Sequence, residues 1–453
     1  MEGLQLIPNF FLFICVHLRN LRTDLFDSWI GGRVPSYSSL RSREVGRISL
    51  GLYSIRKDRA VMKKLVGIIG SGLMGRDPFD RRSWSTLSYF FFSALQQRDA
   101  LHRAFGVEVP RLKRLGYIAR NIHPDRETWR GRFYNDTGYR DALTAEIGRQ
   151  LQPDDFDQRF LQVGALYDVP SLVNGRTACY SYHDGNLAET LRSPYAPKGL
   201  GRRNVDRALR YERSVAQGMS HVFVMSDYLR HSFINDLGVL PERVATIGAG
   251  VNLDAIPEPF EDKRYDSMEV LFIGVDFPRK GGWTLLNAFQ AVRDKHPRAV
   301  LHIVGPKSLT IPPGLDGGVI VHGYLSKSVP DDRRRLDDLM KRCCLFVMPS
   351  LYEPFGIAPL EAMVHQLPCL VTDGWALREL VTPGLTGDLV ECGSVDDLQA
   401  KLAGLLSAPD RLRQMGAAGR RFALENYTWD RVVARLLETI HVAAGSEVLR
   451  SKT

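Results

Sequence analysis

From residue 65 onward, short apolar segments alternate with longer segments in which apolar residues recur at helical spacing. The short segments are almost continuously apolar and widely spaced, which is typical of strands in parallel sheets covered by helices on both faces. We therefore predict an α/β fold of two Rossmann-like, doubly wound domains facing each other across a cleft, because such sheets bind ligands at their carboxyl ends. The expected strands are 65–69, 160–163, 178–182, 222–225 and 244–247 in the first half, and 270–273, 300–304, 319–321, 345–348 and 368–372 in the second.

The two halves are separated by a stretch with two prolines and many charges, 253–267, which shows no strand pattern. Residues 1–61 mix Ser, Arg and Gly with short apolar pieces. We expect them to be a poorly ordered extension whose deletion leaves folding and activity intact. The predicted parts are the extension (1–61), a first Rossmann-like domain (62–255), a linker (256–267), a second Rossmann-like domain (268–428), and a helix crossing back with a tail (429–453).

The most informative segment is 352–363, with the sequence YEPFGIAPLEAM, shortly after the strand predicted at 345–348. A strand, a glycine turn and a helix form the phosphate-binding corner of many parallel α/β sheets. Pro359 suits the first helical position, where its missing N–H costs nothing. The backbone amides that stay unpaired at this helix start are suited to bind an anion. They belong to Phe355, Gly356 and Ile357.

Two carboxylates flank this corner. Glu353 precedes it in the loop, and Glu361 is expected in the first helical turn. Even if every residue between them were helical, the two would be about 12 Å apart, too far to share a proton. They are suited instead to accept hydrogen bonds from two separate polyols with an anion between them. A nucleotide sugar, with its ribose, diphosphate and hexose, has this layout.

Four further segments, together with this corner, resemble the family-4-type retaining glycosyltransferases of the GT-B fold. They are 182–184 (YHD), 224–226 (VMS), 247–252 (IGAGVN) and 270–282 (VLFIGVDFPRKGG). The resemblance implies a hexosyltransferase (EC 2.4) that moves a sugar from a nucleotide diphosphate sugar to a hydroxyl acceptor, as in polysaccharide biosynthesis. The acceptor would be a glycan, a lipid-linked saccharide or a small molecule. The first domain would bind this acceptor, and the second the nucleotide sugar.

The same resemblance implies a role for each candidate residue. His183 would contact the donor sugar, and Arg279 and Lys280 would hold the diphosphate. Glu353 would accept a hydroxyl of the hexose, and Glu361 the ribose hydroxyls. Because fixed cations can stabilise the charge that grows on the leaving diphosphate, neither a metal nor another cofactor is predicted.

Three positions leave roles open. In the family an arginine usually follows Gly274, but this chain has Val275, so Arg279 is the expected substitute. Thr86 lies where relatives carry a glycine-containing loop near the diphosphate. Asp184 is interpreted as a cap of the next helix or as a contact to the acceptor.

Residues 70–75 (GSGLMG) match the dinucleotide-binding fingerprint, which makes an NAD(P)-dependent oxidoreductase a rival prediction. The fingerprint needs its third glycine inside a helix, but Pro78 would break such a helix. No second strand ending in an acidic residue is evident at the required distance. In the preferred prediction this loop lets the donor or the acceptor approach the backbone closely, and Gly72 is assigned to donor binding. A non-catalytic nucleotide-sugar-binding GT-B protein is a third alternative.

Cysteine and acidic patterns give no metal site. The six cysteines show no disulfide or metal-ligand spacing. Cys343, Cys344 and Cys369 lie in or beside apolar strands, as expected of buried thiols in the cytoplasm. The segment 155–157 (DFD) resembles the metal-binding acidic pair of the other glycosyltransferase fold, but no apolar strand leads into it, so we interpret it as a polar loop.

The net charge of +9 includes four positive charges contributed by residues 1–61, so the remainder is only modestly basic. No nucleic-acid partner is therefore predicted. No apolar run reaches the 18 or more residues that a membrane span requires. We predict a cytoplasmic protein, and peripheral association with anionic lipid at the inner membrane face stays open.

Overall fold

The computed structural model describes residues 63–70 and 77–450, with the backbone alone for Ser85 and for residues 444–450. The extension predicted at 1–61 and the donor-binding Gly72 lie outside the described residues. Two six-stranded sheets form the described chain, and every strand pair in them is parallel. Among the described helices none has the length and apolar character that crossing a bilayer requires.

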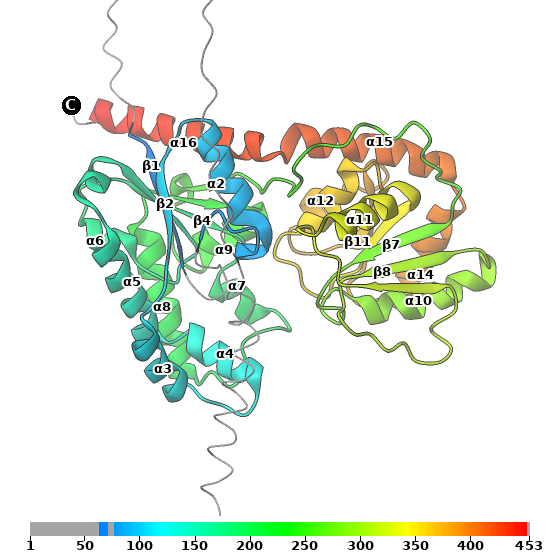
Figure 1. The fold of residues 1–453 in the computed structure, drawn as a ribbon, viewed down its shortest axis with the longest axis horizontal. Helices are drawn as coiled ribbons and strands as arrows, with labels where there is room; N and C mark the ends of the chain where they lie inside the picture. The colour runs from blue at the N-terminus through cyan, green and yellow to red at the C-terminus, as the bar shows by residue number, and fades with distance from the viewer. Residues whose placement is uncertain (1–62, 71–76, 451–453) are drawn as a thin grey trace, which may run out of the picture. The chain divides into compact units, whose positions relative to one another are not determined.

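The first sheet has the strand order β2-β1-β3-β4-β5-β6 (Figure 1). Its order reverses at β1, the strand that starts the domain, which has β2 on one side and β3 on the other. The strands are β1 (Leu65–Gly70), β2 (Leu101–Val107), β3 (Arg159–Val163), β4 (Cys179–His183), β5 (His221–Val224) and β6 (Val244–Thr246). The helices are η1 (Ser83–Thr86), α2 (Leu87–Gln97), α3 (Arg111–Arg120), α4 (Arg126–Tyr134), α5 (Thr137–Gln150), η2 (Pro153–Asp157), α6 (Val169–Val173), α7 (Leu187–Arg192), α8 (Arg202–Gly218), α9 (Asp227–Asn235) and η3 (Pro241–Arg243).

The second sheet has the order β12-β11-β10-β7-β8-β9, which is the strand order of the Rossmann fold. Its strands are β7 (Glu269–Ile273), β8 (Val300–Val304), β9 (Val319–Gly323), β10 (Leu345–Met348), β11 (Cys369–Thr372) and β12 (Gly387–Val390). Its helices are α10 (Gly282–Lys295), α11 (Pro330–Arg342), α12 (Ile357–Val364), α13 (Leu377–Leu380), α14 (Val395–Leu406) and α15 (Pro409–Asn426), and α16 (Trp429–Arg450) follows. The two doubly wound sheets confirm the predicted fold class.

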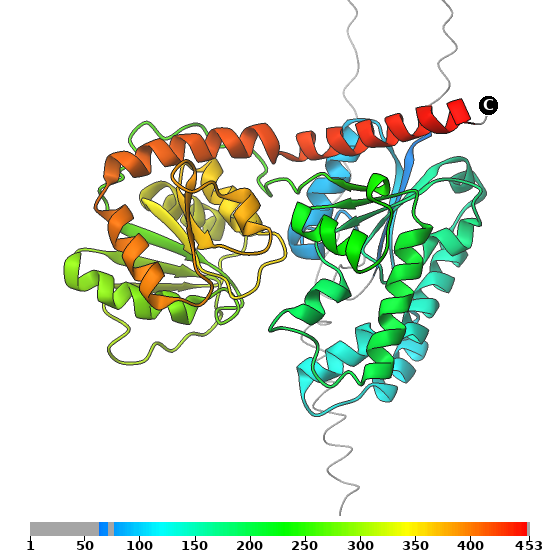
Figure 2. The same ribbon diagram turned by 180° about the vertical axis from the view of Figure 1, so that it is seen from behind.

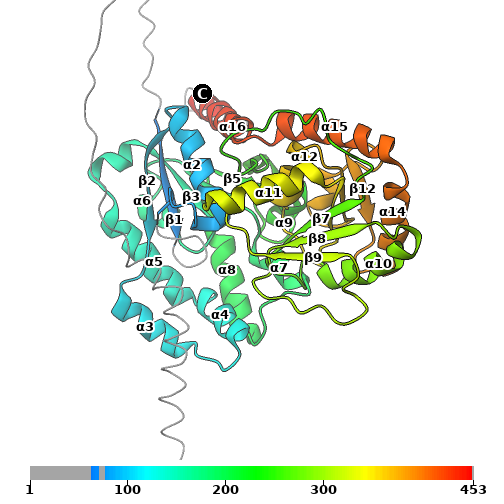
Figure 3. The same ribbon diagram turned by 45° about the vertical axis from the view of Figure 1, so that its right-hand side comes forward.

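Helices cover both faces of each sheet. In the first half, α2 lies on one face, while α5 and α8 lie on the other (Figures 1 and 2). In the second half, α10 and α14 cover one face, and α11 and α12 the opposite one (Figure 3). The central strands are consequently buried throughout, as their apolar sequences predicted.

The terminal helix α16 packs against α2 of the first half. The ring of Trp429 lies 5.7 Å from that of Phe91, centroid to centroid. Its Nε1 donates a hydrogen bond to Oδ1 of Asn252 over 3.1 Å. Trp429 therefore connects the start of α16 with α2 and with the segment that follows β6.

The sequence prediction missed two strands, β2 and β12, and both are edge strands. An edge strand is partly exposed, so its composition is mixed; β2 carries His102 and Arg103 and is mostly half-buried. One argument against the oxidoreductase was that no second strand ending in an acidic residue is evident. β2 corrects this argument, because Glu108 follows the strand directly. Glu108 comes later in the chain than the roughly 20 residues typical of the fingerprint, and its carboxylate pairs with Arg114 over 3.4 Å.

Gly281, in the loop after β7, lies close to Pro349 in the loop after β10, and a substitution at Gly281 tests this close approach. Gly281 has φ +74°, and a Cβ built there would lie 1.8 Å from the carbonyl oxygen of Pro349. We expect Gly281→Ala to lower the free energy of unfolding by at least about 2 kcal/mol, from left-handed strain and the backbone clash. Urea unfolding measures this change.

Gly404 is the matched control, since it lies inside α14 with open space around its Cβ position. Gly404→Ala should raise the free energy of unfolding by about 0.5–1 kcal/mol. Equal effects of the two substitutions would contradict the close approach of the two loops.

Candidate functional site

The candidate site lies where the second sheet reverses its strand order. β7 has β10 on one side and β8 on the other. In doubly wound sheets, ligands bind outside the carboxyl ends of the strands at this switch point. The loops that follow β7 and β10 carry the residues predicted from the sequence, Arg279 with Lys280 and the Glu353 corner.

The two loops are fixed against each other by backbone contacts. The amide of Leu351 donates to the carbonyl of Arg279 over 2.8 Å, and Gly281 packs on Pro349 as described above. The guanidinium of Arg279 donates through Nη1 to the carbonyl of Tyr352 over 2.9 Å. Its Nε pairs with Asp276 over 3.1 Å. Arg279 is thus held by both loops.

Lys280 forms an ion pair with Glu353, through Nζ and Oε2. Both side chains are largely buried, and Nη1 of Arg279 lies 3.9 Å from the same carboxylate oxygen. Burial lowers the pKa of Lys280, while the charge of Glu353 opposes that shift. The structure therefore brings three predicted site residues, Arg279, Lys280 and Glu353, into one charged cluster.

The corner after β10 differs from the prediction in where its helix begins. α12 starts at Ile357, so Pro359 occupies the third helical position and Glu361 the fifth, in the second turn. The helix starts early because Gly356, at φ +105°, adopts a backbone conformation that L side chains rarely take. Pro359 is tolerated there because the N–H groups of the whole first turn have no partner within the helix.

The amides that were predicted to bind an anion stay unpaired within the described part of the chain despite this shift. Among the residues that the structure describes, nothing accepts a hydrogen bond from the amides of Phe355, Gly356 and Ile357. Phe355 and Gly356 are buried, and a Cβ on Gly356 would lie 2.8 Å from the Leu377 side chain. The corner is therefore a packed turn with free donors at the start of a helix.

Glu361 is buried and forms an ion pair with Lys327, through Oε1 and Nζ. Lys327 belongs to the loop between β9 and α11. Arg333 holds this loop, because its Nε and Nη2 donate to the carbonyl of Lys327 over 3.0 and 2.7 Å. The sequence analysis missed Lys327, since nothing local in the sequence marks a lysine of another loop as the partner of Glu361.

His183 is the last residue of β4 and is buried. Its Nε2 has no hydrogen-bond partner among the described residues. Burial lowers its pKa to about 3, so the imidazole is neutral at ordinary pH. The ring packs on Phe233, with centroids 4.7 Å apart.

Asp184 does not cap the next helix, because Asn186 takes that position and accepts from the amide of Glu189. Asp184 instead accepts a hydrogen bond from Nε1 of Trp84 over 3.1 Å. Burial raises the pKa of Asp184, and the charge of Glu353 adds to the rise.

The buried imidazole predicts a dependence of stability on pH. The pKa of His183 lies below its unfolded value of 6.5, so the unfolded state takes up a proton that the folded state does not. Stability should be unaffected above pH 6.5 and fall as the pH drops from there toward 3, by up to about 1.4 kcal/mol per pH unit. Urea unfolding across this range should show a smaller slope for His183→Gln. His231→Gln, on the exposed surface of α9, should keep the slope of the wild type.

The structure also describes the surroundings of three further positions that the sequence analysis discussed. Thr86 has φ +75° at the start of α2, a conformation that favours glycine, which is the residue type that relatives carry nearby. Val275 is 61% exposed and carries no charge, so it does not replace the arginine. Among the described residues, Lys280 is the cation nearest to Glu353, and Arg279 is the next. The polar loop predicted at 155–157 is wrong for Asp155, which is fully buried in η2 and paired with Arg103.

The structure also joins residues that the sequence analysis did not consider. The carboxylate of Glu189, on α7, accepts hydrogen bonds from the hydroxyls of Tyr352 over 2.5 Å and Tyr228 over 3.0 Å. Glu379, on α13, accepts from the amides of Asp227 and Tyr228 at the start of α9. Tyr352 thus ties the loop after β10 to the first half, next to Glu353. No spacing rule links these residues, because each pair is more than 150 positions apart or lies on different helices.

Comparison with known protein families gives one match. Residues 258–422 match the model described as "Glycosyl transferases group 1". This range contains β7, β10 and α12, and with them every predicted site residue of the second half.

Curated relatives carry glycosyltransferase names. MMP alpha-(1->4)-mannosyltransferase of Mycolicibacterium hassiacum is 30% identical over 230 residues, which are 49% of this chain and 54% of the relative. A GDP-mannose-dependent alpha-(1-6)-phosphatidylinositol monomannoside mannosyltransferase of Mycolicibacterium smegmatis is 28% identical over 246 residues, 50% of this chain and 64% of the relative. The matches thus span about half to two thirds of these relatives' length.

Solved structures share the fold. Sucrose-phosphate synthase from Thermosynechococcus elongatus superposes with a TM-score of 0.57 at 16% identity, covering 86% of this chain and 100% of that structure. Anabaena Alr3699/HepE in complex with UDP and glucose gives 0.56 at 16% identity, covering 84% and 100%. The chain therefore has the GT-B fold, and its residues 258–422 match the family model of the glycosyl transferases group 1.

Proposed function

We propose that this protein is a retaining glycosyltransferase that moves a hexosyl group from a nucleotide diphosphate sugar to a hydroxyl acceptor. One observation carries the proposal. At the switch point of the second sheet, free amides of the β10 corner and the cations of the β7 loop lie beside two buried carboxylates. Donors for a diphosphate, flanked by acceptors for two polyols, suit a nucleotide sugar.

In this proposal Lys280 serves two partners. An ammonium group has three N–H donors, so one bond to Glu353 leaves two for the diphosphate. Glu353 then orients Lys280 and keeps its second oxygen for a hexose hydroxyl. Glu361 would exchange its contact with Lys327, a side chain about one third exposed, for the ribose hydroxyls.

We propose front-side attack as the origin of retention. The acceptor oxygen bonds to the anomeric carbon on the face that the diphosphate leaves, and the leaving phosphate oxygen takes the acceptor's proton. His183 is buried and neutral, so we assign its unpartnered Nε2 to hydrogen bonding with a donor-sugar hydroxyl. The nuclear magnetic resonance spectrum of the product reports its anomeric configuration, and an inverted product would contradict this step.

Arg279 and Lys280 would supply the positive charge that stabilises the leaving diphosphate. We therefore propose that transfer itself needs no divalent metal. Adding Mg²⁺ or Mn²⁺ should leave the rate of transfer unchanged.

The test is a panel of nucleotide sugars, assayed for slow hydrolysis and then for transfer to lipid-linked and free saccharides. Release of a nucleoside diphosphate from one donor, with a glycosylated product by mass spectrometry, is the expected result. Tight binding of a nucleoside diphosphate without turnover would favour a non-catalytic binding protein. Affinity for NADH alone would favour the oxidoreductase.

A further inference from the structure

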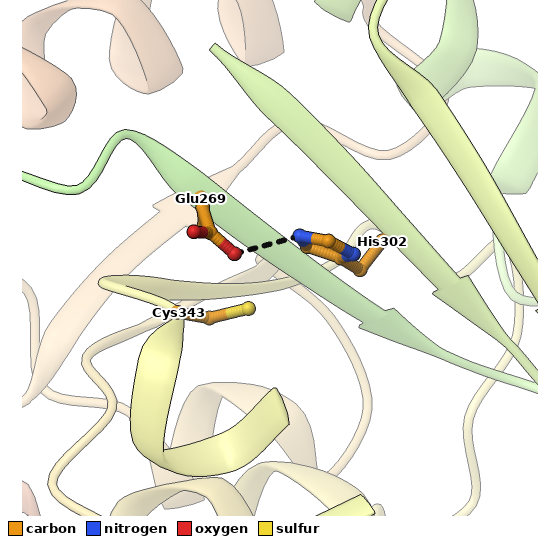
Figure 4. Close-up of side chains that lie close together, drawn as sticks. All are labelled: Glu269, His302 and Cys343. Carbon is orange, nitrogen blue, oxygen red and sulfur yellow. Dashed lines mark hydrogen bonds and ion pairs between the residues drawn. The ribbon is translucent and has the colours of Figure 1, made fainter. Parts of the chain in front are cut away.

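A group of metal-binding side chains lies in the second half, outside the proposed donor site. It consists of Glu269, His302 and Cys343, one ligand atom of each lying within 4.8 Å of the others. Figure 4 shows the three side chains extending toward one another from separate segments of the chain. Oε2 of Glu269 lies 2.8 Å from Nε2 of His302.

The sheet register explains how distant residues meet. Glu269 is the first residue of β7, and its neighbour two positions along, Leu271, pairs with His302 of β8. Side chains two apart on a strand share a face, so Glu269 and His302 lie on the same side of the sheet. Cys343 directly follows α11 and precedes β10, which pairs with β7 on its other edge.

This group lies at the amino ends of the strands, whereas the proposed donor site lies at their carboxyl ends. Glu269 starts β7, whereas Arg279 and Lys280 follow its end. The strand spans about 13 Å between its first and last residues. None of the three residues has a place in the proposed transfer reaction, although His302 is fully buried in the middle of a strand.

Two contacts show that the group is suited to a cation. The guanidinium of Arg342 already lies there, with Nε 2.7 Å from Oε2 of Glu269 and Nη2 3.3 Å from Nε2 of His302. Its side chain is 52% exposed and can move into solvent. On the other side of the ring, Nδ1 of His302 lies 3.0 Å from Nε2 of His322, the kind of outer hydrogen bond that orients metal-binding histidines.

We propose that Glu269, His302 and Cys343 form a Zn²⁺ site, with water as the fourth ligand, that fastens the amino ends of β7, β8 and β10. A thiolate, an imidazole and a carboxylate are the ligand types that Zn²⁺ takes in proteins. On binding, the Cys343 thiol loses its proton to solvent and Arg342 moves out into solvent. His302 is then neutral with its single ring proton on Nδ1, toward His322, which leaves the lone pair of Nε2 for the metal. The site contributes to stability and leaves the transfer reaction untouched.

The second acidic group with metal-ligand geometry carries no such argument. His102, Asp154 and Asp155 also lie close together, but Arg103 binds both oxygens of the Asp155 carboxylate through Nε and Nη2. Arg103 is mostly buried there, so a metal would have to displace a packed side chain.

Cobalt is the probe for the proposed zinc site, because a thiolate bound to Co²⁺ gives a charge-transfer absorption. The full chain, freed of metal with a chelator and then desalted, is titrated with Co²⁺. We expect this absorption to saturate at one equivalent and to vanish when Zn²⁺ is added. Zn²⁺ should also raise the Tm of the protein, while the rate of nucleotide-sugar turnover stays the same.

Variants separate this site from adventitious binding. Cys343→Ser should abolish the charge-transfer absorption and weaken Zn²⁺ binding by more than about 10-fold. Cys344→Ser is the matched control, since that neighbouring buried thiol donates to the backbone carbonyl of Glu269 and lies outside the group. Arg342→Ala should strengthen Zn²⁺ binding by removing a competing cation.

Three results would overturn the proposal. They are a wild-type protein that gives no charge-transfer absorption with Co²⁺, an absorption unchanged in Cys343→Ser, or one lost in Cys344→Ser. The wild-type titration decides the question even if Cys343→Ser fails to fold. The outcome is independent of the proposed transferase activity, which the donor panel tests separately.

Discussion

Lys280→Ala should reduce the turnover of the preferred nucleotide sugar by about 10²- to 10³-fold, the typical effect of removing one fixed donor from developing negative charge. The reason is the position of its ammonium group, which is paired with Glu353 in the loop that leads into the free amides of the β10 corner. The leaving diphosphate gains charge as the glycosidic bond breaks, so the loss should fall on kcat more than on KM. Initial-rate kinetics with saturating acceptor measure both.

The same substitution should also lower stability, because it leaves the buried carboxylate of Glu353 without its nearest cation. Arg279, at 3.9 Å, compensates only in part. The double variant Lys280→Met with Glu353→Gln removes both charges and should recover much of the Tm without recovering turnover. This pattern separates a chemical role from a structural one.

Lys295→Ala is the matched control. Lys295 is an exposed lysine in the last turn of α10, and its loss should change neither turnover nor Tm. If Lys280→Ala kept turnover close to that of the wild type, Lys280 would have no part in the reaction and the proposed mechanism would be wrong.

Glu361→Ala should weaken binding of UDP or GDP by roughly 10- to 100-fold, corresponding to about 1.5–3 kcal/mol for hydrogen bonds to a charged acceptor. Glu361 is buried in the second turn of α12, one turn beyond the free amides. We assign its carboxylate to the ribose hydroxyls. Isothermal titration calorimetry with each nucleotide measures the change in Kd.

Lys327→Ala is the informative comparison, because it removes the ion pair with Glu361 but keeps the carboxylate. If the ribose replaces Lys327 at Glu361, this variant should bind the nucleotide as tightly as the wild type or more tightly. Equal losses in both variants would show that the ion pair, and not the ribose contact, supports binding.

The sequence predicted the central strands and the β10 corner because their signals are local. β10 is a continuous apolar segment, and Gly356, which follows it in the turn before α12, has a positive φ. The start of α12 was misplaced by two residues because proline is tolerated throughout a first turn as well as at its first position. The edge strands β2 and β12 were missed because their exposed faces carry mixed residues.

Contacts between distant segments were beyond the reach of sequence patterns. Lys327 meets Glu361, and Tyr352 meets Glu189, only because the fold brings separate loops and helices together. The group of Glu269 and His302 with Cys343 likewise has no recognisable spacing, since its members come from β7, β8 and the segment before β10. Cysteine spacing alone therefore could not indicate it.

The most direct measurement of the central claim is a crystal structure with UDP or GDP bound. The diphosphate is expected within hydrogen-bonding distance of the Phe355 to Ile357 amides and of Lys280, with the ribose hydroxyls on the Glu361 carboxylate. A nucleotide bound elsewhere, with the amides of that corner turned onto protein acceptors, would contradict it.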